Sequence, residues 1–457
     1  MYICKTFYKN TVYMDTLMLF LQLAVVLAMI FFGARKGGLG MGIYGTVGVA
    51  ILVFCFGCQP GDTPIDVMMI ILAVITASSC LQAAGGLDFM VDVAARFLRK
   101  HPSQITYYGP LTTWLLCILA GTAHTCYALL PIISEIATRA KIRPERPLSV
   151  ATIAASLGIT GSPVSAATVA VLSDGLLGGH GIGMKDILLV TIPASIISIL
   201  VAAFVQNHVG KPLEEDPEYQ RRLKEGLIEP DKMPAGETVE EKKASPYAKR
   251  AVAVFLCGVV VVALLGSFPS WRPLNSAGSP MSMNPIIEMV MMVIAALILI
   301  VGKADVKAAV KGNIFSAGMT AMISIFGIAW MGSTFFNHNQ EAITGAVQGM
   351  FTQYPILFAV ALFIFSILLF SQAVTVKTLY PVGISLGIPP MLLLAMFPAV
   401  NGYFFLPTYP TEVAAIGFDR TGTTKIGKFV INHSFQLSGF ITTIVSIVVG
   451  LLLISIM

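Results

Sequence analysis

The chain has 457 residues, of which 56% are hydrophobic and only 12% charged, about half the charged share of an ordinary soluble domain. So much hydrocarbon excludes a single soluble core, and the net charge of +5 comes from basic residues near the ends of apolar runs, which disfavours nucleic acid as a partner. A helix rises about 1.5 Å per residue, so roughly 20 apolar residues cross the ~30 Å hydrocarbon layer. The composition predicts an all-α polytopic membrane protein.

The chain begins with an unpatterned extension at 1–13, and Met14 is an equally good start. The first apolar run, from Leu17 to Phe32, lacks an A-x-A-like cleavage site, which predicts a retained span rather than a signal peptide. Six of the seven cysteines lie in or beside apolar segments, where Cys acts as a small hydrophobe. Because no second pair or His cluster accompanies Cys55 and Cys58, we predict no metal and no cofactor.

Ten apolar runs are long enough to cross a bilayer. The predicted spans are 14–33, 39–58, 65–87, 148–173, 187–206, 250–268, 284–302, 314–333, 391–419 and 432–454. Two further apolar segments, 104–138 and 355–388, are broken by polar residues, and we predict them to be re-entrant hairpins, although two short spans each fit the charges equally well. The basic clusters at 35–36, 96–100, 139–146, 303–311 and 420–428 all fall in the cytoplasm when both termini are periplasmic.

The long hydrophilic stretch at 207–249 divides the chain into a first transmembrane repeat, 14–206, and a second, 250–457, joined by a cytoplasmic linker. Each half has three spans, a hairpin and two more spans. Because five crossings separate the two starts, the second half begins from the opposite side, which makes the repeat inverted. A local echo supports this: GTAHTCYALLP at 121–131 aligns with SQAVTVKTLYP at 371–381, and SPVSAA at 162–167 with YPTEVA at 409–414.

Polar interruptions at membrane depth must be buried in protein or line a wet cavity. There are four, at 121–125, 158–165, 371–375 and 406–412, and in inverted-repeat transporters the half-helix N-termini at such breaks face anionic groups of the substrate. The candidate substrate-binding residues are Thr122, His124, Thr125, Thr160, Ser162, Ser165, Gln372, Thr375, Lys377, Thr408, Thr411 and Glu412. The alternative for each hydroxyl is a bond to a helix carbonyl or a place in helix packing.

Three of these candidates are ionisable, which is costly inside a membrane and usually functional. Lys377 either pairs with a substrate carboxylate or neutralises Glu412. Glu412 is a candidate for carrying a coupling proton or binding a cation, and for His124 a hydrogen-bonding role at the hairpin tip is favoured over proton transfer.

The string GTTKIGK at 422–428 is a near miss to a phosphate-binding loop, because Phe429 replaces the required Ser or Thr and no strand precedes it. Without nucleotide-binding machinery, transport is predicted to be secondary. No HExxH motif, catalytic carboxylate pair or nucleophile triad occurs in the spans, so we predict no enzyme.

Several motifs resemble the anaerobic C4-dicarboxylate uptake and exchange (Dcu) family, from about Met14 to the C-terminus. They are GARKGG at 33–38, GGLD at 85–88, RPERP at 143–147, LPTYPT at 406–411, FDRTGTT at 418–424 and IGKFVINH at 426–433. Lys377 and the RRLKEGL string at 221–227 look closer to its A-type members.

The resemblance implies a secondary transporter that exchanges fumarate, malate, aspartate and succinate across the bacterial inner membrane, with both termini periplasmic. The implied partners are these dicarboxylates and membrane lipid, with a membrane sensor kinase as a further candidate. The alternative is a dicarboxylate-binding sensor or co-sensor subunit. The oligomeric state stays open.

Overall fold

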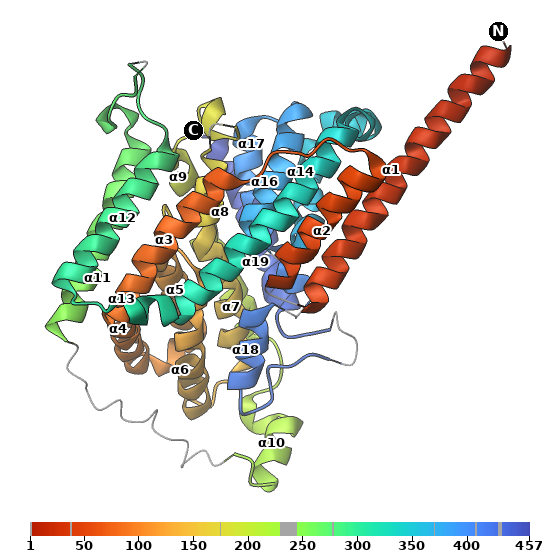
Figure 1. Cartoon of the computed structure of the whole chain (residues 1–457). Coiled ribbons are helices and arrows are strands. Elements are labelled where there is room, and N and C mark those ends of the chain that lie inside the picture. Colours follow the sequence, from red (N-terminus) through yellow and green to blue (C-terminus); the bar gives the residue numbers. More distant parts are fainter. Residues whose placement is uncertain are drawn as a thin grey trace.

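The computed structural model describes residues 2–36, 39–173, 175–228, 245–276, 278–369, 371–406, 409–427 and 432–457. These residues fold into helices (Figure 1). Their β pairing amounts to two isolated bridges, Leu274 with Pro280 and Ile426 with His433. The predicted all-α class is therefore confirmed.

The first half of the chain contains α1 to α10. Their bounds are α1 Tyr2–Lys36, α2 Leu39–Phe56, α3 Ile65–Ala83, α4 Gly86–Lys100, α5 Ile105–Ala120, α6 Cys126–Arg139, α7 Glu145–Thr160, α8 Ala166–Val171, α9 Met184–Asn207 and α10 Pro217–Lys224. The second half contains α11 Pro246–Ser267, α12 Met283–Val301, α13 Val306–Lys311, α14 Asn313–Gln353, α15 Phe358–Leu369, α16 Gln372–Ser385, α17 Pro390–Ala395, the 3₁₀ segment η7 Phe397–Phe405, α18 Pro410–Phe418 and α19 Gln436–Ile454.

Within the described part of the chain, six helices are long and apolar enough to cross a membrane, or up to eight when two bent pairs each count as one span. The six are α2, α9, α11, α12, α14 and α19, and the bent pairs are α3 with α4 and the helices on either side of the break before α18. Among the described residues, the two other predicted spans do not form a single apolar helix long enough to cross a membrane. One is the apolar part of α1, Leu17–Gly33, and the other is divided between α7 and α8.

Four structural features differ from the sequence prediction. Helix α4 bends 71° away from α3, and α14 runs 41 residues to Gln353 instead of ending near residue 333. Two short helices were also not predicted. They are α13 and α10, and α10 lies inside the segment predicted as a linker. Because α4, α10 and α13 are short or carry a polar face, a search for long apolar runs passes over them.

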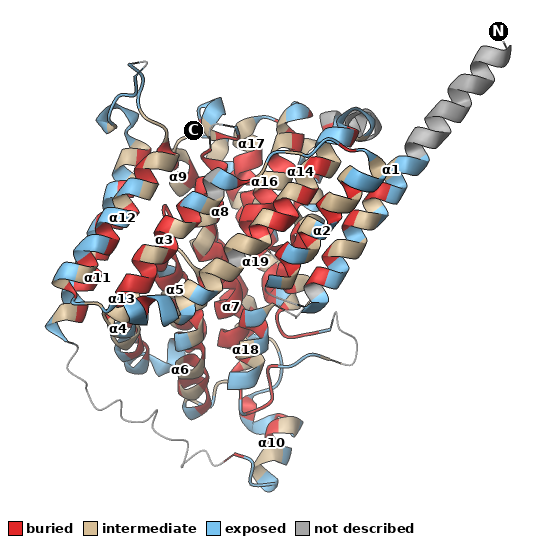
Figure 2. Cartoon of the chain, in the orientation of Figure 1, coloured by how far each residue is buried: buried red, intermediate tan, exposed pale blue. Residues whose placement is uncertain are grey.

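Burial is concentrated in the middle of the helical body, and exposed side chains cover its outer helices (Figure 2). Many of the exposed side chains are large and apolar, including Phe54, Ile300 and Ile444. On a soluble protein such a surface would aggregate, whereas against lipid tails it carries no penalty. The exposure pattern agrees with a membrane-embedded body.

Contacts between helices come in matched pairs, one from each half of the chain. The contact of α3 with α12 matches that of α14 with α2, because α3 and α14 are the third spans of their halves and α2 and α12 the second. In the same way, the contact of α5 with α7 matches that of α15 with η7, and the contact of α6 with α18 matches that of α16 with α8. Helices α9 and α19, which close the two halves, pack on each other, with Ser446 Oγ donating to Ser198 Oγ at 2.8 Å. A two-fold internal repeat produces contacts of this kind.

Candidate functional site

The first hairpin turns at Gly121, directly after α5. Gly121 has a φ of 69°, the left-handed conformation that favours glycine. A Cβ there would lie 2.9 Å from Val164 Cγ2, so the tip also packs too closely for a side chain. Thr122 then accepts a hydrogen bond on Oγ1 from the His124 backbone N–H at 3.3 Å and starts the turn that leads into α6.

The second hairpin repeats this construction between α15 and α16. Ser371 is extended, and its Oγ accepts a hydrogen bond from the Val374 backbone N–H at 3.4 Å, as expected of a helix N-cap. The backbone N–H groups of Gln372 and Ala373 belong to the first turn of α16, which has no intrahelical acceptors. Each hairpin therefore presents a helix N-terminus at its tip.

The two broken helices supply the other interruptions. Between α7 and α8, Ser162 Oγ donates to the Ile118 carbonyl oxygen at 2.6 Å and Ser165 Oγ donates to the Ile159 carbonyl oxygen at 2.6 Å. The matching break lies between η7 and α18, where Tyr409 caps α18 and Pro410 opens it. The predicted hairpin tips and helix breaks are present among the described residues, with 407 and 408 of the last break lying outside them.

All four interruptions border one cavity of about 380 Å³. The hairpin tips contribute Gly121, Thr122, His124, Ser371, Gln372 and Ala373; the broken helices contribute Ile159, Ala166, Ala167, Tyr403, Tyr409 and Pro410. The remaining wall comes mainly from α3 and α14, including Ser78 and Ser324. Residues more than 200 positions apart in the sequence thus meet at one site.

The cavity lining contains no Lys, Arg, Asp or Glu among the described residues. Its electropositive character comes from helix N-termini, because the first turns of α16 and α18 and the turn into α6 all border it. Each such end carries a partial positive charge and free N–H groups. The site is therefore suited to an anion that is bound by backbone groups and released again.

Three of the predicted site residues line this cavity: Thr122, His124 and Gln372. Gln372 Nε2 donates to the Ser156 carbonyl oxygen at 2.8 Å and to the Tyr403 hydroxyl at 3.2 Å, and it also bonds to Asn401 Oδ1. It therefore fixes the first turn of α16 against α7 and η7. The His124 ring stacks on Tyr127, with centroids 5.8 Å apart.

The hydroxyls of five other predicted residues donate to backbone carbonyls, which was the alternative interpretation of each. Thr125 bonds to Thr122, Thr160 to Leu157 and Thr375 to Ser371, and the serines at 162 and 165 bond as described above. They are absent from the cavity lining. Their position satisfies carbonyls that the helix breaks expose.

The remaining predicted residues are Thr408, which lies outside the described residues, and three residues behind the cavity wall. Thr411 and Glu412 are each 1% exposed in the first turn of α18. Lys377 Nζ donates to Ser173 Oγ at 3.4 Å, where α16 meets α8. Among the described residues no ion pair joins Lys377 to Glu412, and both roles predicted for Lys377 stay predictions.

The cavity also includes residues that the sequence argument missed, among them Ser78, Ser324, Tyr403 and Tyr409. Ser78 and Ser324 lie inside unbroken helices, where a single serine gives no signal of a site. Tyr409 belongs to the break at 406–412 and was detectable as part of that motif. Tyr403 precedes the break, and only the fold brings it beside the hairpin tips.

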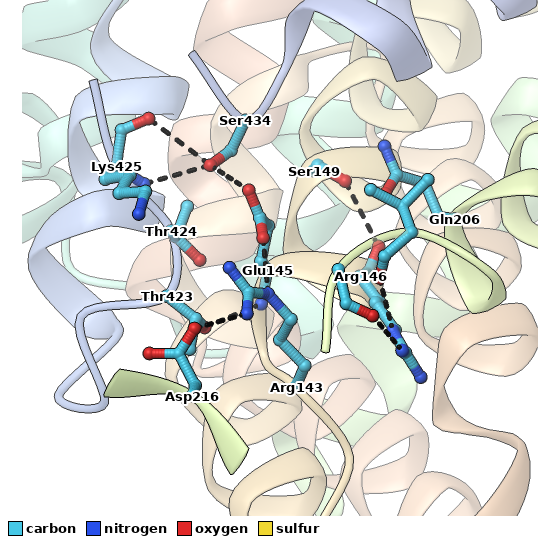
Figure 3. A network of polar contacts seen from close by, with 12 residues as sticks. Arg143, Glu145, Arg146, Ser149, Gln206, Asp216, Thr423, Thr424, Lys425 and Ser434 are labelled. Atoms are coloured by element: carbon cyan, nitrogen blue, oxygen red, sulfur yellow. Dashed lines mark hydrogen bonds and ion pairs between the residues drawn. The ribbon is translucent and has the colours of Figure 1, made fainter. Parts of the chain in front are cut away.

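A buried polar network holds the ends of the broken helices that lie away from the cavity (Figure 3). Arg143, 6% exposed, donates through Nε to Glu145 Oε2 at 2.5 Å and through Nη1 to Asp216 Oδ2 at 2.5 Å. Glu145 begins α7, and its Oε1 accepts from Ser434 Oγ at 2.6 Å. The RPERP motif of the first half thus binds both the start of α10 and the loop that follows α18.

The DRTGTT motif at 419–424 of the second half also belongs to this network. Asp419 accepts hydrogen bonds from Thr421, Thr423 and Thr424, and Thr423 Oγ1 accepts from the Glu145 backbone N–H at 3.2 Å. The RPERP and DRTGTT motifs, which belong to different halves of the chain, therefore meet. They join the start of α7 to the end of α18.

Comparison with known proteins identifies the family. Residues 18–457 match the family described as anaerobic C4-dicarboxylate membrane transporter. The anaerobic C4-dicarboxylate transporter DcuB of Escherichia coli O6:H1 is 41% identical over 435 residues, covering 94% of this chain and 97% of that protein. The C4-dicarboxylate transporter DcuA of Escherichia coli K12 is 40% identical over 443 residues, covering 95% and 99%.

DcuA of Wolinella succinogenes is 39% identical over 433 residues, covering 95% and 98%; these identities do not separate the A-type from the B-type. Among solved structures, the YdaH transporter of Alcanivorax borkumensis covers 84% of each chain at 16% identity with a TM-score of 0.44, too distant to carry an argument. The family match spans the whole helical body and both hairpins. The chain belongs to the family of anaerobic C4-dicarboxylate membrane transporters.

Proposed function

We propose that this protein carries C4-dicarboxylates across the bacterial inner membrane and works as an exchanger. The observation that supports this is the single cavity where both hairpin tips and both broken helices meet, bordered by helix N-termini. The family is one of membrane transporters, so the prediction that the chain is not an enzyme is confirmed.

The cavity suits a small diacid. Its volume of about 380 Å³ lies at the small end of ligand pockets. The two hairpins approach from opposite repeats, so each can offer N–H groups to one carboxylate of a four-carbon chain. Fumarate, malate, aspartate and succinate share this spacing of two carboxylates, and we propose them as substrates.

Exchange follows from the charge of the cavity. A bound dianion is not neutralised by any fixed cation among the described lining residues, so its movement carries charge across the membrane. Swapping one dicarboxylate for another of equal charge moves no net charge, and the loaded protein can travel in both directions. The N-termini lower the cost of binding without trapping the anion.

Counterflow in proteoliposomes tests this proposal. Vesicles loaded with unlabelled succinate receive labelled fumarate or aspartate outside, and a parallel set is loaded with propionate, which has one carboxylate. We expect succinate-loaded vesicles to accumulate label and propionate-loaded vesicles to stay at the level of empty ones. No stimulation by internal succinate contradicts exchange.

The second candidate, a sensor or co-sensor subunit that binds dicarboxylate without moving it, predicts a different pair of results. Succinate would raise the unfolding temperature of the purified protein, yet counterflow would be absent. A membrane sensor kinase stays a proposed partner for either function. We also propose that both termini are periplasmic, which agrees with the charge distribution described above.

A further inference from the structure

Glu412 is a buried carboxyl group that the binding cavity does not use. It is the third residue of α18, is 1% exposed, and its Oε2 has no hydrogen-bond partner among the described groups. The two residues that begin the same turn, Tyr409 and Pro410, line the cavity, but Glu412 does not. The carboxyl group therefore lies one layer behind the wall that a bound anion would touch.

Among the described residues, no cation pairs with Glu412. Helix α18 packs on α6 and α7. From α6, Cys126 and Tyr127 interact with Glu412 electrostatically, while Glu135 and Arg139 pair with each other at the opposite end of α6. From the segment before α18, Tyr403 and Tyr409 interact with Glu412 as well. Helix α7 carries the ionisable residues Glu145 and Arg146 in its first turn. Both belong to the polar network at the end of α7 that lies away from the cavity. Thiols and phenols are neutral at physiological pH.

An ionised carboxylate in this position would be costly. The backbone N–H of Tyr409 is its one assigned stabilising contact, and no described ion pair includes it. Burial of an unpaired charge is strongly unfavourable, and such a group binds a proton instead. The aligned position in the first repeat is Ser165, so the carboxyl group is specific to the second repeat.

We propose that Glu412 is the proton-binding residue that couples dicarboxylate uptake to proton entry. This inference rests on the proposed transport of dicarboxylates. An ionised Glu412 would repel a dianion in the adjacent cavity, so protonation favours substrate binding. By thermodynamic reciprocity, substrate binding favours protonation. One proton then enters with the dicarboxylate, leaves Glu412 for water once the substrate has left, and the empty protein returns.

Exchange does not use this step. When one dicarboxylate replaces another, Glu412 keeps its proton through both crossings and no net proton moves. The neutral variant Glu412→Gln imitates the protonated state permanently. It should therefore separate the two transport modes, losing net uptake driven by a pH gradient while counterflow persists.

The experiment compares wild type, E412Q and a matched control in proteoliposomes. The control is E288Q, which makes the same change in α12 away from the cavity lining. Counterflow at equal pH is measured first, then uptake of labelled succinate into empty vesicles with the outside acidic. We expect wild type and E288Q to show both activities, and E412Q to show counterflow and lose the acceleration by the pH gradient.

Direct proton binding gives an independent readout. Adding succinate to weakly buffered wild-type protein in detergent should remove protons from solution, and E412Q should bind succinate, detected as a raised unfolding temperature, without proton uptake. Retained pH-gradient acceleration in E412Q overturns the proposal. So does a wild type driven by sodium instead of protons, or a folded E412Q that no longer binds succinate. Absence of counterflow in the wild type instead removes the proposed function.

Discussion

Gln372 joins the two repeats at the level of single side chains. It begins α16 and lines the cavity, yet its amide donates to Ser156 in α7 and to Asn401 and Tyr403 in η7. The position of the α16 N-terminus therefore depends on contacts with both broken helices. Its Oε1 is buried and has no hydrogen-bond partner among the described groups.

Replacing Gln372 with Leu removes these bonds at similar volume. Each buried hydrogen bond contributes about 0.5–1.5 kcal/mol, and about 1.4 kcal/mol corresponds to a tenfold change in affinity. We expect Q372L to need about tenfold more external succinate for half-maximal counterflow. The control is Q220L on α10, whose amide bonds to Glu214 far from the cavity. Equal half-saturation in both variants would contradict a positioning role.

Asp216 is the residue through which the linker holds the network of Figure 3. Burial opposes its ionisation, but the Tyr219 backbone N–H and the Arg143 guanidinium bring the pKa of Asp216 below its ordinary value. Removing one partner of a buried ion pair costs about 3–5 kcal/mol. We expect D216A to speed hydrogen exchange of the α10 amides at neutral pH.

The pH dependence of this effect has a definite sign. Because the folded pKa of Asp216 is depressed, its contribution is complete above the unfolded value of about 3.9 and is lost as the pH falls through the folded pKa. The difference between wild type and D216A should therefore shrink only in acid. The control E214A removes an exposed pair with Lys141 and should change little. Equal effects of D216A and E214A would argue against the network.

Sequence reasoning located the four helix interruptions that border the cavity, but it did not separate the side chains that line the cavity from those that do not. Polar residues inside an apolar segment indicate irregular backbone. All four of the interruptions found in this way border the cavity. A threonine that lines the cavity and one whose hydroxyl satisfies a carbonyl have the same sequence signature, as Thr122 and Thr125 show. The distinction depends on which neighbour lies within 3 Å or so of the oxygen, and that neighbour often comes from the other repeat.

At the scale of elements, close packing of α2 on α14 depends on glycine. A Cβ on Gly327 would lie 1.8 Å from the Gly42 carbonyl oxygen, so two backbones meet where neither has a side chain. Helices in lipid associate by this kind of contact, since no hydrophobic force drives them together. The pair holds α14, which supplies one wall of the cavity, against the first half of the chain.

Gly327→Ala should separate these helices. Because the obstructing atom is backbone, one helix must move, and we expect a lower unfolding temperature and weaker counterflow. The matched control is Gly417→Ala in α18, where a Cβ would meet nothing within 4 Å. Similar unfolding temperatures for the two variants would show that α2 and α14 tolerate a wider separation.

Some elements were visible in the sequence and others were not. Runs of about 20 apolar residues identify spans because the bilayer sets their length. Helices α4 and α10 carry charged faces and lie at the ends of the helical body (Figure 1), so their length and composition are set by local contacts instead. Helix α10 is held by the ion pair between Asp216 and Arg143, which are 73 positions apart in the sequence. No local sequence pattern reveals a contact of this kind.

For the whole molecule, the two-fold pattern of contacts explains the placement of Lys377 and Glu412. Helix α16 of the second hairpin lies against α8, and α6 of the first hairpin lies against α18. Lys377 therefore meets the first repeat's broken helix, whereas Glu412 meets the first repeat's hairpin. The repeat places these two ionisable side chains at two different helix contacts, although only 35 positions separate them in the sequence.

The repeat also leads to a prediction about the sidedness of the chain. In Figure 1 the C-terminus lies at one end of the helical body and α10 at the other. With a periplasmic C-terminus, α10 is cytoplasmic. In a background where the exposed Cys55 and Cys257 are replaced by Ser, we expect Ile456→Cys to react with a membrane-impermeant maleimide in intact spheroplasts. Lys224→Cys should react only after the membrane is opened. Labelling of both positions from the same side would contradict an odd number of crossings between them and, with it, the inverted relation of the two halves.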